Sequence, residues 1–297
     1  AIAGKKPSLK RITDKKISDI EQFALKSYTG RRVLTAFYQS DIYKFISNKV
    51  NHFRNLKLQQ EIKQDTIPKH IAIIMDGNRR FAGSLGLSPE HGHFYGKNRI
   101  EEVLDWCVDL GIKVLTIYAF STENFNRTSN EVETLMQLCN TELERAKSDS
   151  RIHRNKVRIR VIGQLDELPD DIQISAQNIM TTTKEYDKYH FNIALAYGGR
   201  EEIVQAIKRI AEDVSEGDLE VESISQDTVS TYMYTNGLPD PDLILRTSGE
   251  ERISNFLLWQ LAYSELYFSD VYWPAFQKRD FLRAIQTYQK RKRRFGK

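Results

Sequence analysis

The stretch IAIIMDGNRRF, residues 71–81, is the starting point for the fold of this chain. Its four apolar residues 71–74 have the length and branching of a β-strand that is buried on both faces. Asp76 and Gly77 end this strand abruptly, and Gly77 permits a tight turn. Strands that are buried on both faces are typical of parallel sheets covered by helices. The stretch therefore favours an α/β fold.

The residues after the turn indicate an anion site. Backbone N–H groups and two guanidinium groups would face one anion where a helix begins with Asn78, Arg79 and Arg80. A carboxylate at Asp76 is repelled by a phosphate unless a cation lies between them, and Mg²⁺ is the simplest such cation. The stretch thus predicts a magnesium diphosphate site. A plainer reading, with Asp76 as a helix cap and the arginines on a solvated face, stays open from these residues alone.

Further strands alternate with helices along the chain. We expect strands at residues 114–120, 157–162, 191–197 and 243–246. This alternation predicts a single α/β domain, residues 67–297, with a central, mostly parallel sheet flanked by helices. Residues 1–66 precede it as a basic, aromatic helical extension. A helix of this kind, expected from Ile20 to about Leu58, either packs on the domain or lies on a membrane surface.

The loops that follow these strands should meet at one edge of the sheet. Ligands of parallel α/β sheets bind at the carboxyl ends of the strands. The loop 246–255 holds two arginines and two hydroxyl groups, which makes a second anion site at this edge plausible. Farther on, Glu265 interrupts an apolar, aromatic run, and its burial would be costly without a cation or a hydrogen-bond partner.

Two local features lie in the chain between the two predicted anion sites, residues 76–80 and 246–255. Gly83, Gly86 and Pro89 predict a loop that carries two histidines, His91 and His93. A capping box of Thr128 and Glu131 is expected to start the helix after the second strand.

Composition narrows the class of protein. The net charge of +4 is mild, with basic residues bunched at both ends, as suits anionic surfaces or simply solubility. The chain has two cysteines, Cys107 and Cys139, both in phase with apolar neighbours, so we expect buried thiols without a disulfide or zinc site. No apolar run reaches bilayer length and no signal peptide is evident, so we expect a soluble, cytoplasmic protein, at most peripheral to membrane. Neither a Walker loop nor a dinucleotide fingerprint is present.

Three blocks of this sequence resemble the signature motifs of the cis-prenyltransferase family, the undecaprenyl and dehydrodolichyl diphosphate synthases. They are MDGNRRFA at 75–82, YAFSTENFNR at 118–127 and RTSGEERISNFLLWQLAYSELYF at 246–268. The resemblance runs from about Pro68 to Gly296. It implies repeated condensation of isopentenyl diphosphate onto an allylic diphosphate such as farnesyl or geranylgeranyl diphosphate, with each new double bond cis, and a hydrophobic product tunnel.

The resemblance also implies roles for individual residues. Asp76 would bind Mg²⁺, and Glu265 matches a second acidic metal position. Asn124 would take part in proton removal by orienting a proton path, since an amide is a poor base. The expected substrate contacts are Gly77, Asn78, Arg79, Arg80, Phe81, His93, Ser121, Thr122, Glu123, Phe125, Arg127, Arg246, Arg252, Ile253 and Ser254. Where bacterial members have a basic residue four positions before the histidine, this chain has Pro89.

The end of the chain implies an assembly. Arg294-Phe295-Gly296 fits the Arg-x-Gly tail that reaches the isopentenyl site of a neighbouring subunit in the family, so Arg294 and Gly296 predict a homodimer. The segment GLSPEHGH, residues 86–93, is closer in sequence to archaeal members of the family, which favours geranylgeranyl diphosphate as the primer. Two alternatives remain: a non-catalytic partner subunit, which should lack Asp76 and the Asn-Phe-x-Arg block, and a nucleic-acid-binding protein, which should display its aromatic residues among exposed basic ones. We expect no nucleic-acid partner.

Overall fold

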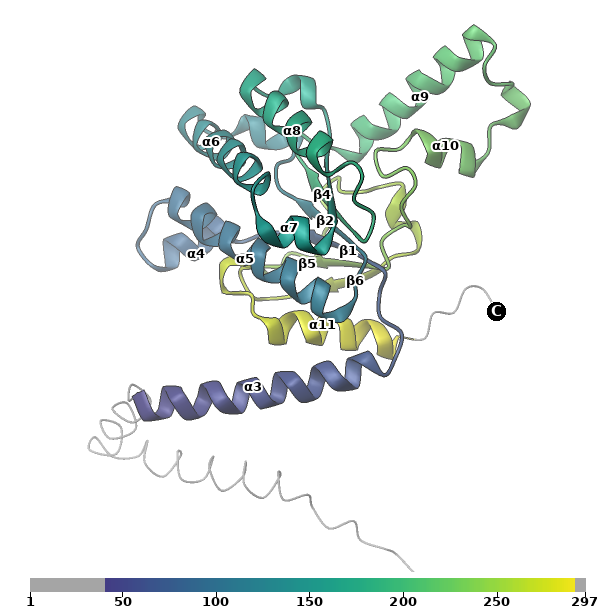
Figure 1. Cartoon of the computed structure of the whole chain (residues 1–297). Helices are drawn as coiled ribbons and strands as arrows, with labels where there is room; N and C mark the ends of the chain where they lie inside the picture. Colours follow the sequence, from purple (N-terminus) through teal and green to yellow (C-terminus); the bar gives the residue numbers. More distant parts are fainter. Residues whose placement is uncertain (1–40, 292–297) are drawn as a thin grey trace, which may run out of the picture. The chain divides into compact units, whose positions relative to one another are not determined.

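A computed structural model describes residues 41–291 of the chain, and it has the α/β architecture that the sequence predicts (Figure 1). Strands alternate with helices along most of its length. The α-helices are α3 Asp41–Lys63, α4 Asn78–Ser84, α5 Pro89–Leu110, α6 Ser129–Ala146, α7 Ser150–Asn155, α8 Asp170–Thr183, α9 Gly199–Glu216, α10 Gln226–Tyr232 and α11 Lys278–Lys290. The strands are β1 His70–Ile74, β2 Val114–Tyr118, β3 Val157–Ile162, β4 Tyr189–Ala194, β5 Leu243–Arg246 and β6 Glu265–Phe268. Short 3₁₀ turns are η1 Thr122–Asn126, η2 Leu165–Glu167, η3 Val221–Ser223, η4 Gln260–Tyr263 and η5 Trp273–Ala275.

The six described strands form one sheet in the order β3-β4-β2-β1-β5-β6, and every neighbouring pair is parallel. Strands β1 and β2 are buried at every position, as central parallel strands must be. Ile74 pairs with Tyr118 on one side and with Arg246 on the other. The loops that follow β1, β2 and β5 therefore begin at the same level, at the carboxyl edge of the sheet.

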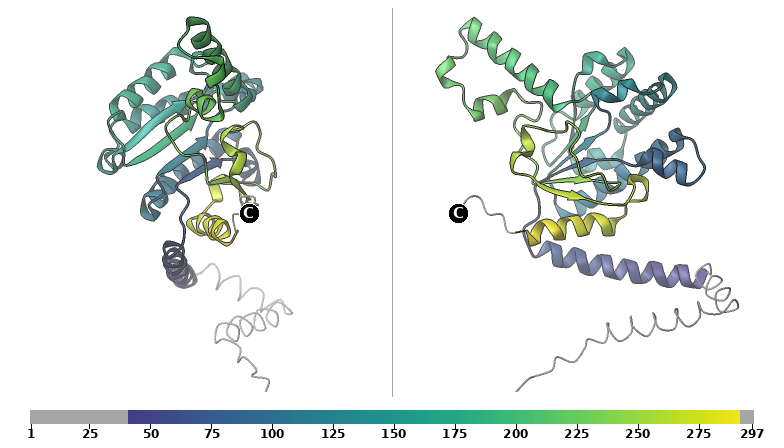
Figure 2. Two further views of the ribbon diagram at one scale, coloured as in Figure 1. Left: turned by 90° about the vertical axis from the view of Figure 1, so that its right-hand side faces the viewer. Right: turned by 180° about the vertical axis from the view of Figure 1, so that it is seen from behind.

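The two faces of the sheet have different partners. On one face, Leu115, Ile117 and Phe191 line a cavity that also touches α5 and α6. On the other face, Tyr118, Tyr197 and Phe256 form an aromatic cluster, with Tyr118 and Phe256 stacked at 4.5 Å between ring centroids. Helix α11 lies along β5 and β6, and α9 with α10 projects away from the sheet (Figures 1 and 2).

The sequence placed three of the strands well and two less well. The predicted strands 71–74, 157–162 and 243–246 agree with β1, β3 and β5 to within one residue. The strand predicted at 114–120 ends at Tyr118, and the one predicted at 191–197 spans Tyr189–Ala194. Residues 120 and 195–197 are as apolar and buried as the strands, so hydrophobicity alone does not mark where they end.

The segment predicted as a loop around Gly83 and Pro89 is mostly helical, which corrects that expectation. Gly83 lies within α4, and α5 begins at Pro89, so His91 and His93 are helical residues. Proline is favoured in the first turn of a helix because its missing N–H is not needed there. Glycine at position 92 serves packing, because a Cβ there would lie 2.1 Å from the carbonyl oxygen of Asn78.

The chain divides into two compact units, residues 1–58 and 59–297. Helix α3 confirms helical structure for residues 41–58 of the predicted arm, and the first forty residues lie outside the described part. Ile62, in the second unit, is buried, and the carbonyl oxygens of Ile62 and Thr66 accept hydrogen bonds from Gln289. The predicted domain boundary after residue 66 stays a prediction. Within residues 41–291, no helix is both long and apolar enough to cross a bilayer.

Candidate active site

The backbone around Asp76 is held from two directions. The Asp76 N–H donates to Thr247 Oγ1 at 2.9 Å, and that hydroxyl group donates to the Asp76 carbonyl oxygen at 2.7 Å. The same carbonyl oxygen accepts from the Trp273 N–H at 3.0 Å. Gly77 then takes a left-handed φ of 98°, and a Cβ there would lie 2.7 Å from Tyr272 Cδ1. Glycine is therefore required at position 77.

The Asp76 carboxylate lies between an arginine of α4 and an arginine of β5. Its Oδ2 accepts from Arg246 Nη2 at 2.7 Å, and its Oδ1 accepts from Arg80 Nη2 at 3.2 Å and from the Gly77 N–H at 2.6 Å. Burial by itself would raise the pKa of Asp76, but the hydrogen bond and charge of Arg246, with Gly77 and Arg80, outweigh it and lower the pKa. The carboxylate is therefore ionised at neutral pH.

Arg246 is the most buried cation of this rim, with 4% of its surface exposed. Its Nη1 donates to Ser254 Oγ at 2.8 Å and to the carbonyl oxygen of Arg252. Its Nε is buried and has no acceptor among the described residues. Ser254 and Asn255 have left-handed φ angles of 48° and 60°, a strained backbone for residues with side chains. The loop thus gives up some stability to shape a cationic pocket around Arg246.

Glu250 joins this pocket to α4, which the sequence did not predict. Its Oε1 accepts from Arg80 Nη1 at 2.9 Å, and its Oε2 accepts from Arg252 Nη1. Arg80 also donates to Ser248 Oγ at 2.6 Å. The Arg-Thr-Ser-Gly-Glu-Glu-Arg run contained part of the signal, since an acidic residue close to an arginine in one loop can pair with it, as Glu250 does with Arg252; the contact with Arg80 comes from another element.

A second cluster surrounds Glu131, which is 5% exposed. Its Oε1 lies 3.0 Å from Arg127 Nη1, 3.3 Å from His93 Nε2 and 3.8 Å from Arg79 Nε. Burial lowers the pKa of His93, Glu131 opposes this through a hydrogen bond, and the charge of Arg127 adds to the lowering. The predicted capping box of Thr128 and Glu131 is wrong, because the Thr128 side chain makes no cap hydrogen bond and Glu131 binds cations instead. The i, i+4 spacing of Arg127 and Glu131 was the available sequence signal.

The loop after β2 joins the same edge. Asn124 Oδ1 accepts from the Ser121 N–H at 3.2 Å, so the amide group of Asn124 is held by the start of its own turn. The Thr122 N–H donates to the carbonyl oxygen of Tyr197 at 3.1 Å. Phe125 packs edge-on against Phe120 with 4.9 Å between the ring centroids.

Several predicted contacts connect or border these loops. Glu123 accepts a hydrogen bond from Asn255 at 3.3 Å, which ties the loop after β2 to the loop after β5. Phe81 lies edge-on to Tyr95 at 5.9 Å, and Ile253 is half-buried between Arg252 and Ser254. Asn78 begins α4, and its Oδ1 is buried with no donor among the described residues.

The structure does not bring Glu265 to Asp76. Glu265 is the first residue of β6 and pairs in register with Leu243, whereas Asp76 lies two residues beyond the level of Arg246. At about 3.3 Å per residue, roughly 15 Å separate the two carboxylates along the sheet. Glu265 Oε2 instead accepts from Arg291 Nη1 at 2.7 Å. The two acids of one chain therefore cannot share an ion. Arg294 and Gly296 lie outside the described residues.

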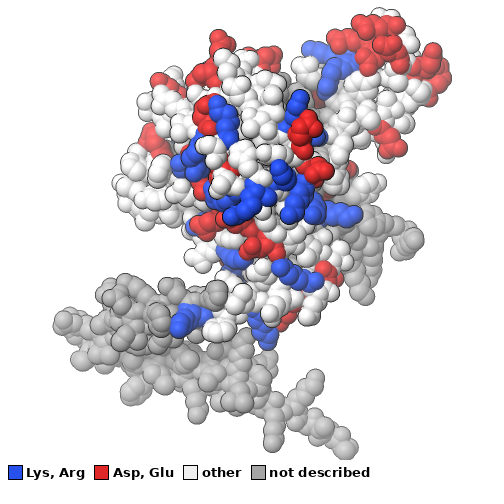
Figure 3. Space-filling view, in the orientation of Figure 1, with Lys and Arg blue, Asp and Glu red and all other residues white. Residues whose placement is uncertain are grey.

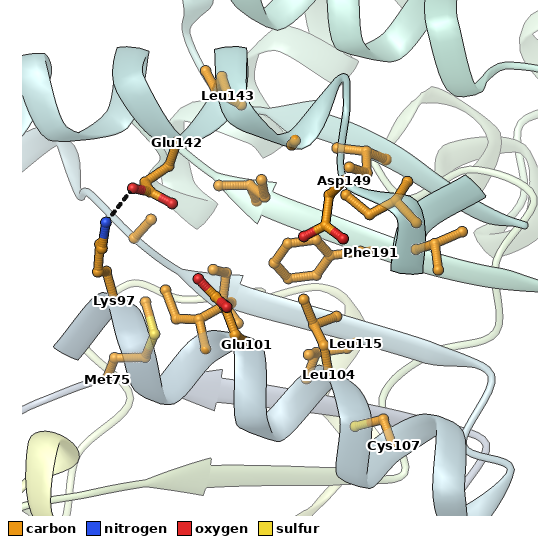
Figure 4. Close-up of a pocket in the computed structure, with 18 of the residues that line it drawn as sticks. Met75, Lys97, Glu101, Leu104, Cys107, Leu115, Glu142, Leu143, Asp149 and Phe191 are labelled. Atoms are coloured by element: carbon orange, nitrogen blue, oxygen red, sulfur yellow. Dashed lines mark hydrogen bonds and ion pairs between the residues drawn. The ribbon is translucent and has the colours of Figure 1, made fainter. Parts of the chain in front are cut away.

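An elongated cavity begins at this rim and continues between the sheet and α5, α6 and α7 (Figure 4). Met75, Asn78 and His93 line it near the rim. Apolar positions of two helices line it: Ile100, Leu104 and Val108 of α5, and Leu135, Leu138, Cys139 and Leu143 of α6. Cys107 is buried and Cys139 half-buried, and both are free thiols. The cavity is long and mostly apolar, with the polar residues Asn78 and His93 at its rim end. This lining suits an amphiphile with an anionic head group.

Comparison with known proteins decides the family. Residues 74–296 match the sequence model of a prenyltransferase family described as putative undecaprenyl diphosphate synthase. The chain belongs to this family. The resemblance that the sequence motifs indicated is thereby confirmed.

Relatives of this prenyltransferase family agree with the match. A protein of Thermoplasma volcanium named tritrans,polycis-undecaprenyl-diphosphate synthase (geranylgeranyl-diphosphate specific) is 54% identical over 240 residues, covering 81% of this chain and 93% of that protein. A protein of Methanocaldococcus jannaschii with the same name is 49% identical over 271 residues, covering 90% and 95%.

Solved structures of this prenyltransferase fold are also similar. Lavandulyl diphosphate synthase from Lavandula x intermedia, in complex with dimethylallyl diphosphate, has a TM-score of 0.74 and 37% identity, covering 78% of this chain and 99% of that one. A probable undecaprenyl diphosphate synthase from Campylobacter jejuni has a TM-score of 0.64 and 34% identity, covering 78% and 100%.

Proposed function

We propose that this protein elongates prenyl chains by adding isopentenyl diphosphate repeatedly to geranylgeranyl diphosphate, with cis double bonds. The product is a polycis-polyprenyl diphosphate of the undecaprenyl class, which serves as a carrier lipid for glycans. One observation supports this most: the arginine and carboxylate network of Asp76, Arg80 and Arg246 adjoins Met75 and Asn78, which line the rim end of an apolar cavity. The choice of primer rests on the two archaeal relatives, whose names specify it.

Each condensation breaks the bond between the allylic carbon and its diphosphate. A new carbon–carbon bond forms to the terminal carbon of isopentenyl diphosphate, which loses a proton. We assign the allylic diphosphate to Arg79, Arg80 and His93, and isopentenyl diphosphate to Arg246, Arg252 and Ser254. The guanidinium groups stabilise the charge that develops on the leaving diphosphate. Asn124, held by the Ser121 N–H, orients the path of the proton.

Mg²⁺ fits this rim when a substrate supplies most of its ligands. Within residues 41–291, no cluster of three metal-binding side chains exists, so the protein alone does not build a complete site. Asp76 offers one ionised carboxylate, as is usual for Mg²⁺ sites on phosphate substrates. The buried Asn78 Oδ1 has no hydrogen-bond donor among the described residues, and a water molecule bound to such an ion would supply one. Arg246 Nε has no acceptor among the described residues and is suited to donate to a phosphate oxygen. When bound, the ion would neutralise charge on the leaving diphosphate.

We propose that the enzyme is a homodimer, located in the cytoplasm with peripheral membrane contact at most. Arg294 and Gly296 support the dimer through their match to the Arg-x-Gly tail. The alternative of a non-catalytic partner subunit is disfavoured because Asp76, Asn124, Phe125 and Arg127 are all present.

The decisive experiment incubates the purified protein with labelled isopentenyl diphosphate, Mg²⁺ and either the farnesyl or the geranylgeranyl primer, and sizes the products. We expect long products, formed faster from the geranylgeranyl primer and absent after chelation of the metal. Absence of label in prenyl products with both primers would overturn the enzyme assignment, and size-exclusion chromatography with light scattering tests the dimer.

A further inference from the structure

The wall of the cavity is of two kinds. The sheet side is mostly apolar, with Leu115, Ile117 and Phe191 on strands of the sheet, and its polar residues Lys113 and His190 lie at the amino end of the strands. The outer side, where α5 faces α6 and α7, carries charged side chains among the apolar ones. Figure 4 shows Lys97, Glu101, Glu142 and Asp149 reaching across this side of the cavity. A hydrocarbon channel gains nothing from charges in its lining, so these side chains call for a different explanation.

The charges form ion pairs across the line between the helices. Lys97, Glu101 and Asp105 are spaced by four residues and therefore share one face of α5. Lys97 Nζ lies 2.6 Å from Glu142 Oε1 of α6, and Glu101 pairs with Arg145 of α6 and, at 2.9 Å, with Arg151 of α7.

Arg151 also approaches Asp105 at 3.8 Å. We call the six residues Lys97, Glu101, Asp105, Glu142, Arg145 and Arg151 the charged seam. All six line the cavity.

The seam is open to water along its length. Its side chains are between 20% and 55% exposed, with Lys97 at the low end and Asp105 at the high end. Figure 3 shows basic and acidic side chains mixed over this part of the surface, in the region of α5 and α7. Ion pairs that are this exposed contribute little to stability and exchange readily with water. The seam is therefore easier to part than the packed sheet side.

Each helix of the seam is anchored on its far side. Helix α5 is fixed by the Trp273 indole N–H, which donates to the Gly96 carbonyl oxygen at 2.8 Å, and by the contact of Trp106 with Phe281. Helix α6 is fixed to α8 through Asn140, which bonds Asp171 and Ser175. At the rim, the contact of His93 with Glu131 links α5 and α6 next to the diphosphate site. A gap that opens in the seam below this contact leaves the anchors and the rim in place.

We propose that the charged seam is a lateral gate of the product tunnel, through which the hydrocarbon chain leaves, and that its ion pairs set the length the chain reaches before it leaves. This inference rests on the proposed chain elongation. Every added isoprene unit lengthens a chain whose head stays at the rim, so a full cavity presses the chain against the most easily parted wall. A sideways exit moves the hydrocarbon directly into a lipid or detergent phase, without drawing it past the arginines.

The test compares a broken seam with a rebuilt one. Lys97→Glu sets two carboxylates against each other, and Lys97→Glu/Glu142→Lys restores the pair with its charges exchanged. Asp109→Lys is the matched control, because Asp109 lies on α5 and pairs with Lys278 on α11 at 2.9 Å, outside the cavity. The measurements are the product length distribution, the steady-state rate with and without detergent, and the rate of the first condensation in a single turnover.

We expect Lys97→Glu to shorten the products by at least one isoprene unit and to make the steady-state rate less dependent on detergent. The single-turnover rate of the first condensation should stay within about twofold of the wild-type rate, since exposed ion pairs affect their surroundings weakly. The exchanged pair should restore the wild-type lengths, and Asp109→Lys should leave them unchanged. Products of wild-type length from Lys97→Glu, or an equal shortening by Asp109→Lys, would overturn the gate.

A second variant closes the seam covalently, which keeps the proposal testable if Lys97→Glu fails to fold. In Lys97→Cys/Glu142→Cys, a bismaleimide joins the two positions, and equally treated wild-type protein controls for reaction at Cys107 and Cys139. The linked enzyme should make and retain one chain per site, whereas turnover at the rate of the unlinked variant would contradict the gate. A wild-type enzyme without elongation would instead overturn the proposed function, so the two failures are distinguishable.

Discussion

The two ends of the parallel sheet both carry buried polar groups, but they use them differently. At the carboxyl end, the charged side chains of Arg80 and Arg246 both pair with the Asp76 carboxylate. A ligand can take the place of a partner in these pairs. At the amino end, His70 is fully buried and bonds the backbone carbonyl oxygen of Pro239 and the hydroxyl of Thr116.

The difference lies in what each polar group is bonded to. Asn192 donates to Thr116, and this chain of neutral groups continues to His70 and the backbone, so it holds strands together and offers nothing to a substrate. The carboxyl end holds ion pairs between charged side chains. It also has an unsatisfied hydrogen-bond donor, Arg246 Nε, which is buried and has no acceptor among the described residues. Mutual pairing of charges thus marks the reactive end better than burial does, and better than an unsatisfied buried atom, since Asn192 Oδ1 also lacks a donor among the described residues.

The largest effect is expected from Asp76→Asn. The change keeps the shape but removes the charge that balances Arg246 and that would hold the metal. We expect kcat/KM to fall about 10³-fold, or roughly 4 kcal/mol, as for other charged groups that act on the leaving group. Steady-state turnover at saturating Mg²⁺ measures this, and a variant within tenfold of wild type would show that the carboxyl end does not depend on this acid.

At the other end of the sheet, the expected effect is on stability. Burial lowers the pKa of His70 from its ordinary 6.5 to about 4, so the folded protein keeps the imidazole neutral. The unfolded chain binds a proton below pH 6.5, and stability is therefore full above that pH and lost as the pH falls towards 4. The loss amounts to about 3 kcal/mol.

Urea unfolding of the wild type and of His70→Gln between pH 7.5 and 4.5 tests this difference. The wild type should lose more stability than the variant over this range, while both keep the same kcat at pH 7.5. Parallel curves would mean that His70 does not titrate on unfolding.

Arg246→Lys should have a smaller effect on catalysis. An ammonium group cannot contact Asp76, Ser254 and the Arg252 carbonyl oxygen together in the way a guanidinium does. We expect a loss of roughly 30-fold in kcat/KM, about 2 kcal/mol, mainly through KM for isopentenyl diphosphate. The matched control is Arg252→Lys, at a side chain that is 62% exposed, which should change KM less. Equal effects of both changes would argue against a special position for Arg246.

The smallest effect is expected from Glu131→Gln. Loss of this charge leaves Arg79, His93 and Arg127 without their common partner and should change KM for the allylic diphosphate about tenfold, or roughly 1.4 kcal/mol, with kcat nearly constant. Glu133→Gln changes an exposed acid of the same helix and serves as the control. If both substitutions have the same effect, Glu131 does not organise the allylic pocket.

The sequence anticipates the carboxyl end because parallel strands carry their following loops to one edge. Asp76 and Arg246 are 170 residues apart, yet each follows or ends a recognisable apolar strand, so their meeting was predictable. Glu131 was misassigned to a capping box. Its spacing from Arg127 was a local signal, but its partners His93 and Arg79 approach from other helices, and no local pattern encodes those two contacts. Glu265 was predicted from its motif as a second acidic metal position, but the chain between Arg246 and Glu265 returns to the amino edge of the sheet, and the motif does not reveal this.

Glu250 has one oxygen on Arg80 and the other on Arg252, which belong to the two proposed anion pockets. In the proposed mechanism, an incoming diphosphate that takes one arginine would leave the displaced carboxylate with the other, so that the occupancy of one pocket would alter the affinity of its neighbour, and the reverse would hold equally. After each cycle the same carboxylate stands ready to reclaim the arginine that the departing pyrophosphate gives up. Under that proposal, Glu250 would act as a tethered competitor for the leaving group and would favour clearing the site over tight retention of the by-product.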